Sequence, residues 1–138
     1  MSKADRIAHL RVEGPGGLNP HYAGYFACFN RGEYFEAHDV LEALWLGERK
    51  TPNDLFYKGL IQLAGAFVHL KKSRLRPADA LFRLAWANLV RYRPVHERLD
   101  VEEVLGLIVT WREDLARGGF AENPLSRRPP PQLAPLTV

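Results

Sequence analysis

Apolar residues recur along most of this chain at the spacing of an α-helix, and no segment shows the alternation typical of a strand. Tyr22, Phe26 and Phe29 are one example, because they fall at positions i, i+4 and i+7 of one helical face. Breaks in the pattern divide the chain into five expected helices, at about residues 20–29, 32–46, 51–72, 77–93 and 100–118. The pattern therefore predicts an all-α fold, a compact bundle of about five helices built from helical hairpins.

Capping residues support several of these boundaries. Asn19 and the proline after it combine an N-cap with the residue best tolerated at the first helical position. Asp100 and Glu103 have the spacing of a capping box, and so do Asn30 and Glu33 before the second helix. These signals predict where three of the five helices begin.

Length and the proline content of the C-terminal end predict the domain organisation. A chain of 138 residues suits one domain that can bury a core without disulfides or structural metals. We expect a flexible N-terminal segment at residues 1–18, the helical bundle at residues 19–119 and a proline-rich extended tail at residues 120–138. Cys28, Trp86 and Trp111 lie at apolar helical positions and are expected in the core.

The composition, with 46% hydrophobic and 25% charged residues, is that of a soluble globular protein. One cysteine cannot form a disulfide within the chain, which favours a reducing, cytoplasmic setting. The N-terminus lacks the continuous apolar core of a signal peptide. The most apolar run, residues 55–70, is shorter than the ~20 residues that span a bilayer. We therefore expect a cytoplasmic protein with no membrane partner.

The formal net charge of +3 is mild. The clearest basic cluster consists of Lys71, Lys72, Arg74 and Arg76, and such clusters can bind nucleic-acid phosphates. Basic residues near the end of a helix are more often solvated, and they also complement the helix dipole. A nucleic-acid partner is accordingly the weakest of the functions considered.

Candidate chemistry comes from two helices. On a helical wheel of residues 32–46, His38 and Glu42 fall among large apolar residues, whereas Glu36 and Asp39 fall in a sector expected to face water. A buried carboxylate needs a hydrogen-bond donor, and His38, one turn before Glu42, can supply it.

The helix at residues 51–72 is apolar on nearly every side, which marks it as the central helix. Its exception is a stripe of Lys58, Gln62, Gly65 and His69. If this helix and the one before it form an antiparallel hairpin, His38 and Glu42 can face Gln62 and His69.

Two interpretations of this polar cluster remain open. It can hold a divalent metal ion through His38, Glu42 and His69, with Glu42 or Glu36 as general base of a hydrolase. Alternatively, the cluster, with Gln62 and Lys58, is a structural network that fixes helix register, or the solvent edge of the central helix. The spacing lacks the second histidine of the zincin motif, so the metal interpretation has no specific motif behind it.

The stretch "FNRGEYFEAHDVLEALW" followed by "FYKGLIQLAGAFVHLKK" resembles domain-of-unknown-function family 309, small helical proteins of bacteria and archaea. The first family motif falls on Glu36, Ala37, His38, Glu42 and Trp45. The second falls on Gly59, Leu60, Ile61, Gln62 and His69. Asp39 stands where the family usually has glutamate, and the resemblance covers about residues 25–89. It implies an all-helical bundle and no particular activity.

The function expected from the sequence is a non-enzymatic binding or scaffold module. Its polar cluster is then structural, and its helical surface meets a protein partner or a second copy of the chain. A metal-dependent, hydrolase-like enzyme and a weak nucleic-acid binder are the alternatives.

Overall fold

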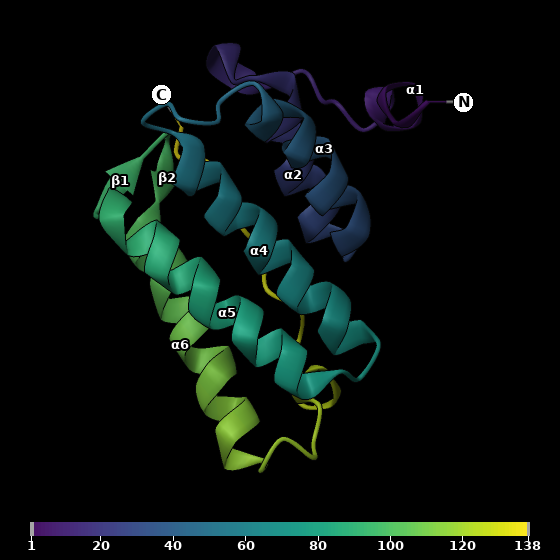
Figure 1. Cartoon of the computed structure of the whole chain (residues 1–138), viewed down its shortest axis with the longest axis vertical. Coiled ribbons are helices and arrows are strands. Elements are labelled where there is room, and N and C mark those ends of the chain that lie inside the picture. The colour runs from purple at the N-terminus through teal and green to yellow at the C-terminus, as the bar shows by residue number, and fades with distance from the viewer. Residues whose placement is uncertain (1, 138) are drawn as a thin grey trace.

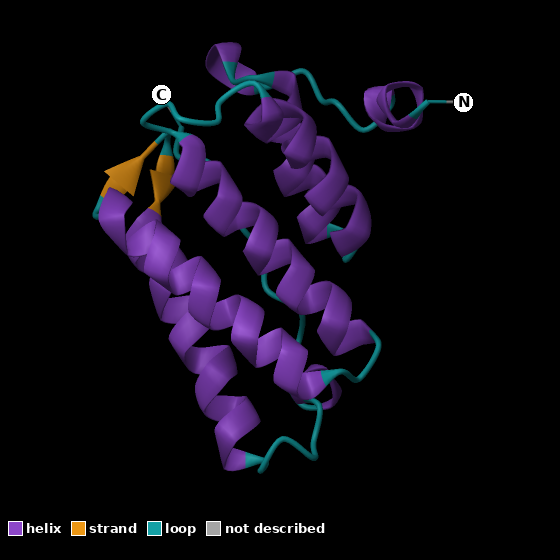
Figure 2. Cartoon of the chain, in the orientation of Figure 1, coloured by secondary structure: helices purple, strands orange, loops and turns teal. Residues whose placement is uncertain are grey.

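The structure is a computed structural model that describes residues 2–137 (Figure 1). Within this range the chain forms six α-helices and almost no strand, so the all-α prediction is confirmed (Figure 2). The helices are α1 (Lys3–Ala8), α2 (Pro20–Asn30), α3 (Tyr34–Leu46), α4 (Asp54–Lys71), α5 (Leu75–Leu89) and α6 (Val101–Arg117). Two short antiparallel strands, β1 (Val95–His96) and β2 (Leu99–Asp100), connect α5 to α6 and were not predicted.

Helix α4 is the central helix, as its apolar wheel predicts. It packs against α3 on one side and α5 on the other, while α2 packs on α3 and α6 packs on α5. Phe67 of α4 lies at the middle of the core, where its ring contacts Phe29, Tyr34, Phe82 and Trp111 at centroid distances of 5.0–5.5 Å. Aromatic rings from five helices thus meet at one point.

A glycine sets the close approach of α4 and α5. A Cβ atom on Gly59 would lie 2.8 Å from Cγ of Leu89 and 3.3 Å from Cβ of Asn88. Only a residue without a side chain therefore allows the two helices to pack this closely.

The predicted N-cap residues are confirmed at two helices and wrong at a third. The side chain of Asn19 accepts hydrogen bonds from the first turn of α2, and that of Asp100 accepts from the amide of Glu103. Asn30, by contrast, is the last residue of α2 and does not cap α3. Its side chain bonds both the amide and the carbonyl of Leu133, each at 2.7 Å.

The N-terminal segment, which we expected to be flexible, contains a short helix. Ser2 caps the short helix α1, which buries Ile7, and Leu10 just after this helix is also buried. Gly24 of α2 makes room for this segment, because a Cβ there would lie 2.2 Å from the carbonyl oxygen of Leu10. The sequence pattern missed α1 because six residues are too few to show a helical period.

Between the turn at Pro124–Ser126 and residue 137 the proline-rich tail has no helix or strand, and it runs back along the bundle (Figure 1). It is held by Leu133, which is 2% exposed, and by the hydrogen bonds to Asn30.

Two further observations complete the fold. Trp111 is in the core as expected, but the expectation for Trp86 is wrong, because 38% of that residue is exposed.

None of the helices among residues 2–137 is long and apolar enough to cross a membrane.

Candidate functional site

A groove on the outer side of α4, walled by α3 and α5, is the candidate site. Its cavity has a volume of about 250 Å³. Helix α3 contributes Phe35 and His38, α4 contributes Gln62, Gly65 and His69, and α5 contributes Leu81. We call this cavity the α3–α4–α5 groove. It brings together His38, Gln62 and His69, three of the residues singled out from the sequence.

Gln62 links the floor of the groove to its α5 wall. Its Oε1 atom accepts a hydrogen bond of 2.7 Å from Nδ2 of Asn88. The Nε2 group of Gln62 donates to no other described residue, which leaves it available to a ligand.

His69 carries an unsatisfied nitrogen in the same groove. Its Nδ1 atom is buried and has no hydrogen-bond partner among the described residues. Burial lowers the pKa of His69 below its ordinary value, and the positive charges of Arg74 and Lys72 lower it further. An imidazole that burial keeps neutral, with a buried Nδ1 that has no partner among the described residues, thus lies at one end of the groove.

Phe35 gives the groove an exposed aromatic wall, since 54% of the residue is accessible to water. It lies one turn before His38 on α3, and its ring is stacked on the His38 imidazole at a centroid distance of 6.4 Å. The sequence analysis missed Phe35 and Leu81. A signal for Phe35 existed, because residues three apart share a helix face.

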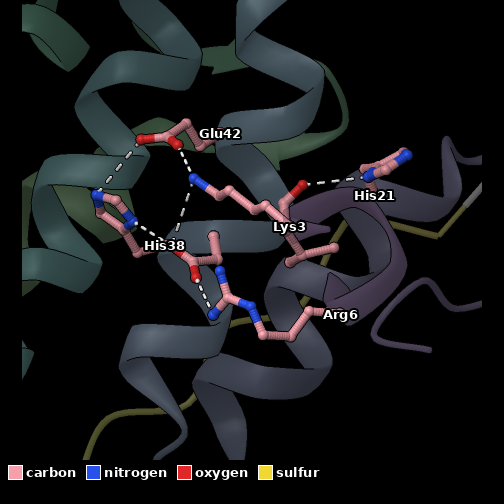
Figure 3. A network of polar contacts seen from close by, with 7 residues as sticks. Lys3, Arg6, His21, His38 and Glu42 are labelled. Carbon is pink, nitrogen blue, oxygen red and sulfur yellow. Dashed lines mark hydrogen bonds and ion pairs between the residues drawn. The ribbon is translucent and has the colours of Figure 1, made fainter. Parts of the chain in front are cut away.

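Glu42 and His38 also belong to a second group of polar residues, the α1–α3 polar cluster of Lys3, Arg6, His38, Asp39 and Glu42 (Figure 3). The ammonium of Lys3 pairs with Glu42 and lies 3.9 Å from Oδ1 of Asp39. Nη1 of Arg6 lies 3.5 Å from the other oxygen of Asp39. The cluster therefore fixes α1 to α3 through opposite charges.

His38 completes this cluster from the groove side. Its Nδ1 atom donates a 3.1 Å hydrogen bond to Oδ1 of Asp39, and the proton must be on Nδ1 because a carboxylate can only accept. Its Nε2 atom is 4.0 Å from Oε2 of Glu42, too far for a hydrogen bond. The main donor to Glu42 is therefore Lys3, and not His38 as the sequence suggested.

Of the two α3 residues expected to face water, Glu36 and Asp39, only Glu36 does so. Asp39 was expected to face water, yet it is 5% exposed and is the one buried charged residue of the described chain. Helix α1 covers it, and a helical wheel of α3 alone carries no information about a covering segment. Glu36 is partly exposed, beside Lys71 and Lys72.

The predicted metal ligands do not converge. His69 lines the α3–α4–α5 groove, whereas the Glu42 carboxylate is directed towards Lys3 of α1. Residues 2–137 contain no group of three or more His, Cys, Asp or Glu side chains that could hold a metal ion. The residues present thus do not fit the predicted metal site.

The remaining predicted residues lie at the surface. Lys58 is exposed on α4. In the basic cluster, Lys71 donates to the carbonyl of Gly32, and the Arg76 guanidinium lies 4.5 Å from the centroid of the Phe120 ring. Lys72 and Arg74 are exposed and form no ion pair with residues 2–137.

Comparison with known protein families gives one match. The family described as "Domain of unknown function (DUF309)" matches residues 22–81, a segment that runs from α2 into α5 and contains every residue that lines the groove. Searches of curated proteins and of solved structures gave no match. The match over residues 22–81 thus agrees with the resemblance to this family that the two sequence motifs carry.

Proposed function

We propose that the protein is a non-enzymatic binding module whose α3–α4–α5 groove holds an amphipathic helix of a partner protein. The observation that carries this proposal is the combination, in one groove, of an exposed phenylalanine with polar atoms that lack protein partners. Phe35 is largely exposed, Nδ1 of His69 is buried and unpaired, and Nε2 of Gln62 donates to no described residue.

The size of the groove favours a helix over a free small molecule. Small-molecule pockets usually have volumes of about 300–1,000 Å³ and enclose most of the ligand. A cavity of about 250 Å³ between two helices has room for one or two side chains. A partner helix inserts side chains in this way, at positions i and i+3 or i+4.

Charge at one end of the groove indicates the kind of helix. Lys72 and Arg74 form no ion pair with described residues. The positive charges of both lower the pKa of His69, so they lie near this end of the groove. This end of the groove therefore favours a negative charge on the partner. The expected partner helix carries one or two large apolar residues and an acidic residue near the His69 end.

A selection experiment tests this proposal. A library of helical peptides displayed on phage is selected against the full chain, and enriched peptides are synthesised. Addition of such a peptide to ¹⁵N-labelled protein should shift the backbone amide signals of the groove residues on α3 and α4. Failure to enrich any peptide, or shifts confined to α6, would contradict the proposal.

Matched variants identify the groove as the site. Phe35→Ala should raise the dissociation constant of the selected peptide about tenfold or more, because aromatic anchors dominate the energies of such contacts. Val109→Ala is the control, since Val109 is also an exposed apolar residue but lies on α6. Equal binding by wild type and Phe35→Ala would exclude the groove.

A further inference from the structure

The outer face of α5 and α6 carries a second apolar surface, separate from the α3–α4–α5 groove. Trp86 of α5 and Val109 of α6 are exposed, Val109 to 43%. A cavity of about 440 Å³ lies between them and is also lined by Arg112, Glu113 and Ala116. An exposed tryptophan beside an open hollow is typical of an interaction surface. We call this surface the α5–α6 face.

The two helices of this face run antiparallel, side by side along one edge of the bundle (Figure 1). The ion pair between Asp79 and Arg112, at 2.8 Å, gives a common level from which to count along both helices. At 1.5 Å per residue, Trp86 lies about 10 Å beyond this level on α5. Gly106 lies about 9 Å beyond it in the same direction on α6. Trp86 and Gly106 are thus at nearly the same height.

Gly106 leaves a gap at this height. It is exposed, and a Cβ atom placed on it would have no neighbour within 4 Å. Val109, one turn after Gly106 on α6, is an exposed apolar residue at the edge of this gap. The face therefore carries a partly exposed tryptophan ring on α5 and a gap on α6 at nearly the same height along the helices.

We propose that the α5–α6 face binds a second copy of this chain. A two-fold axis lying in the interface, parallel to the helices, places α5 of each copy on α6 of the other at the same height. Trp86 of one copy then lies over Gly106 and Val109 of its partner. The two pairs of helices then stack face to face as a four-helix bundle.

Charges on the face support a second copy over another partner. Arg83 on α5 and Glu113 on α6 are exposed, and neither forms an ion pair with residues 2–137. Along the helices they are about 7 Å apart in height, which a long arginine side chain can span. The same two-fold axis brings each Arg83 near the Glu113 of the other copy, so the face is complementary to itself.

The size of the face sets the expected affinity. Helices of 15 and 17 residues, packed about 9 Å apart, present a face of roughly 22 Å by 20 Å. Such a face has a footprint of about 440 Å². A standard stable interface buries about 800 Å² of accessible surface on each partner, so this face is smaller. We therefore expect a weak dimer that forms with increasing protein concentration, in the micromolar range.

Sedimentation equilibrium of the full chain between about 10 μM and 1 mM tests the dimer. The wild type should change from monomer to dimer across this range. Gly106→Gln should weaken association about tenfold or more while the fold is kept, because glutamine fills the gap and favours a helix more than glycine does. Leu84→Gln, also at an exposed apolar position of α5 but outside this face, should dimerise like the wild type.

A charge exchange separates this two-fold arrangement from other modes of association. Arg83→Glu alone and Glu113→Arg alone should each weaken the dimer, and the double variant should restore it. A wild type that stays monomeric at the highest concentration, or a dimer that Gly106→Gln leaves unchanged, would overturn the proposal. So would a double variant weaker than both single ones.

Discussion

Replacement of Asp39 by asparagine is the sharpest test of how α1 is held on the bundle. Asp39 is buried, and its carboxylate receives a hydrogen bond from His38 and contacts the positive charges of Lys3 and Arg6. Asparagine has the same shape and still accepts the hydrogen bond from His38. The substitution therefore removes the charge and little else.

The expected loss follows from these contacts. A hydrogen bond to a charged acceptor contributes about 1.5–3 kcal/mol, and one to a neutral acceptor contributes about 1 kcal/mol. The side chains of Lys3 and Arg6 are 44% and 53% exposed, so each ion contact contributes only about 0.2–1 kcal/mol. Because the variant no longer buries a charge, part of this loss is recovered. We expect Asp39→Asn to lower the free energy of unfolding by about 1–2 kcal/mol.

Urea unfolding followed by circular dichroism measures this loss at two salt concentrations. At about 0.1 M NaCl the Debye length is about 10 Å, and at about 1 M it is about 3 Å, so salt should reduce the loss. Glu36→Gln is the matched control, because Glu36 is a carboxylate of the same helix that forms no ion pair with residues 2–137. The reasoning is refuted if both variants lose the same amount, or if the Asp39→Asn loss is independent of salt.

Three further predictions concern the rest of the chain. Gly59→Ala should destabilise the protein by about 1–3 kcal/mol in urea unfolding, because its Cβ would overlap Leu89. Gly106→Ala, where a Cβ has free space, should stabilise it by about 0.5–1 kcal/mol. Equal effects of the two substitutions would contradict the close packing of α4 on α5. Leu133→Ala should make the tail sensitive to limited proteolysis, because Leu133 is its buried anchor, and a tail that stays resistant would contradict this anchoring. For His69, whose pKa lies below its ordinary 6.5, the unfolded chain binds the proton more readily than the native state. The measured quantity is the free energy of unfolding of the wild type minus that of His69→Gln. This difference should have its full value above about pH 6.5 and should decrease as the pH falls through the pKa of His69. A difference independent of pH between about 5 and 7.5 would contradict the lowered pKa of this imidazole.

Local signals in the sequence predicted the helices and part of the site. The spacing of apolar residues marks five helices, and the caps at Asn19 and Asp100 mark two of their starts. His38, Gln62 and His69 line one groove because their stripes on α3 and α4 face the same side once the helices pack. This part of the site depends only on helical geometry and on a hairpin between neighbouring helices.

Contacts between distant parts of the chain were beyond the sequence pattern. Lys3 and Glu42 are 39 residues apart, and Asn30 and Leu133 are 103 residues apart. Neither contact has a local periodic signal. As a result, Asp39 was assigned to solvent and Glu42 to the wrong donor. The exposure of Trp86 has a similar origin, because it depends on how α6 packs against α5.

The dissociation constant of a selected helical peptide for Gly65→Leu, compared with the wild type, tests the proposed role of the groove most directly. Gly65 lines the groove, and a Cβ atom there would lie 3.2 Å from Cδ1 of Leu81, so a leucine side chain would fill the cavity. Gly106→Leu is the control, since it also replaces a helical glycine but lies on α6. We predict that Gly65→Leu binds the peptide at least about tenfold more weakly, while Gly106→Leu binds it like the wild type. Unchanged binding by a folded Gly65→Leu variant would contradict the proposal that this groove is the binding site.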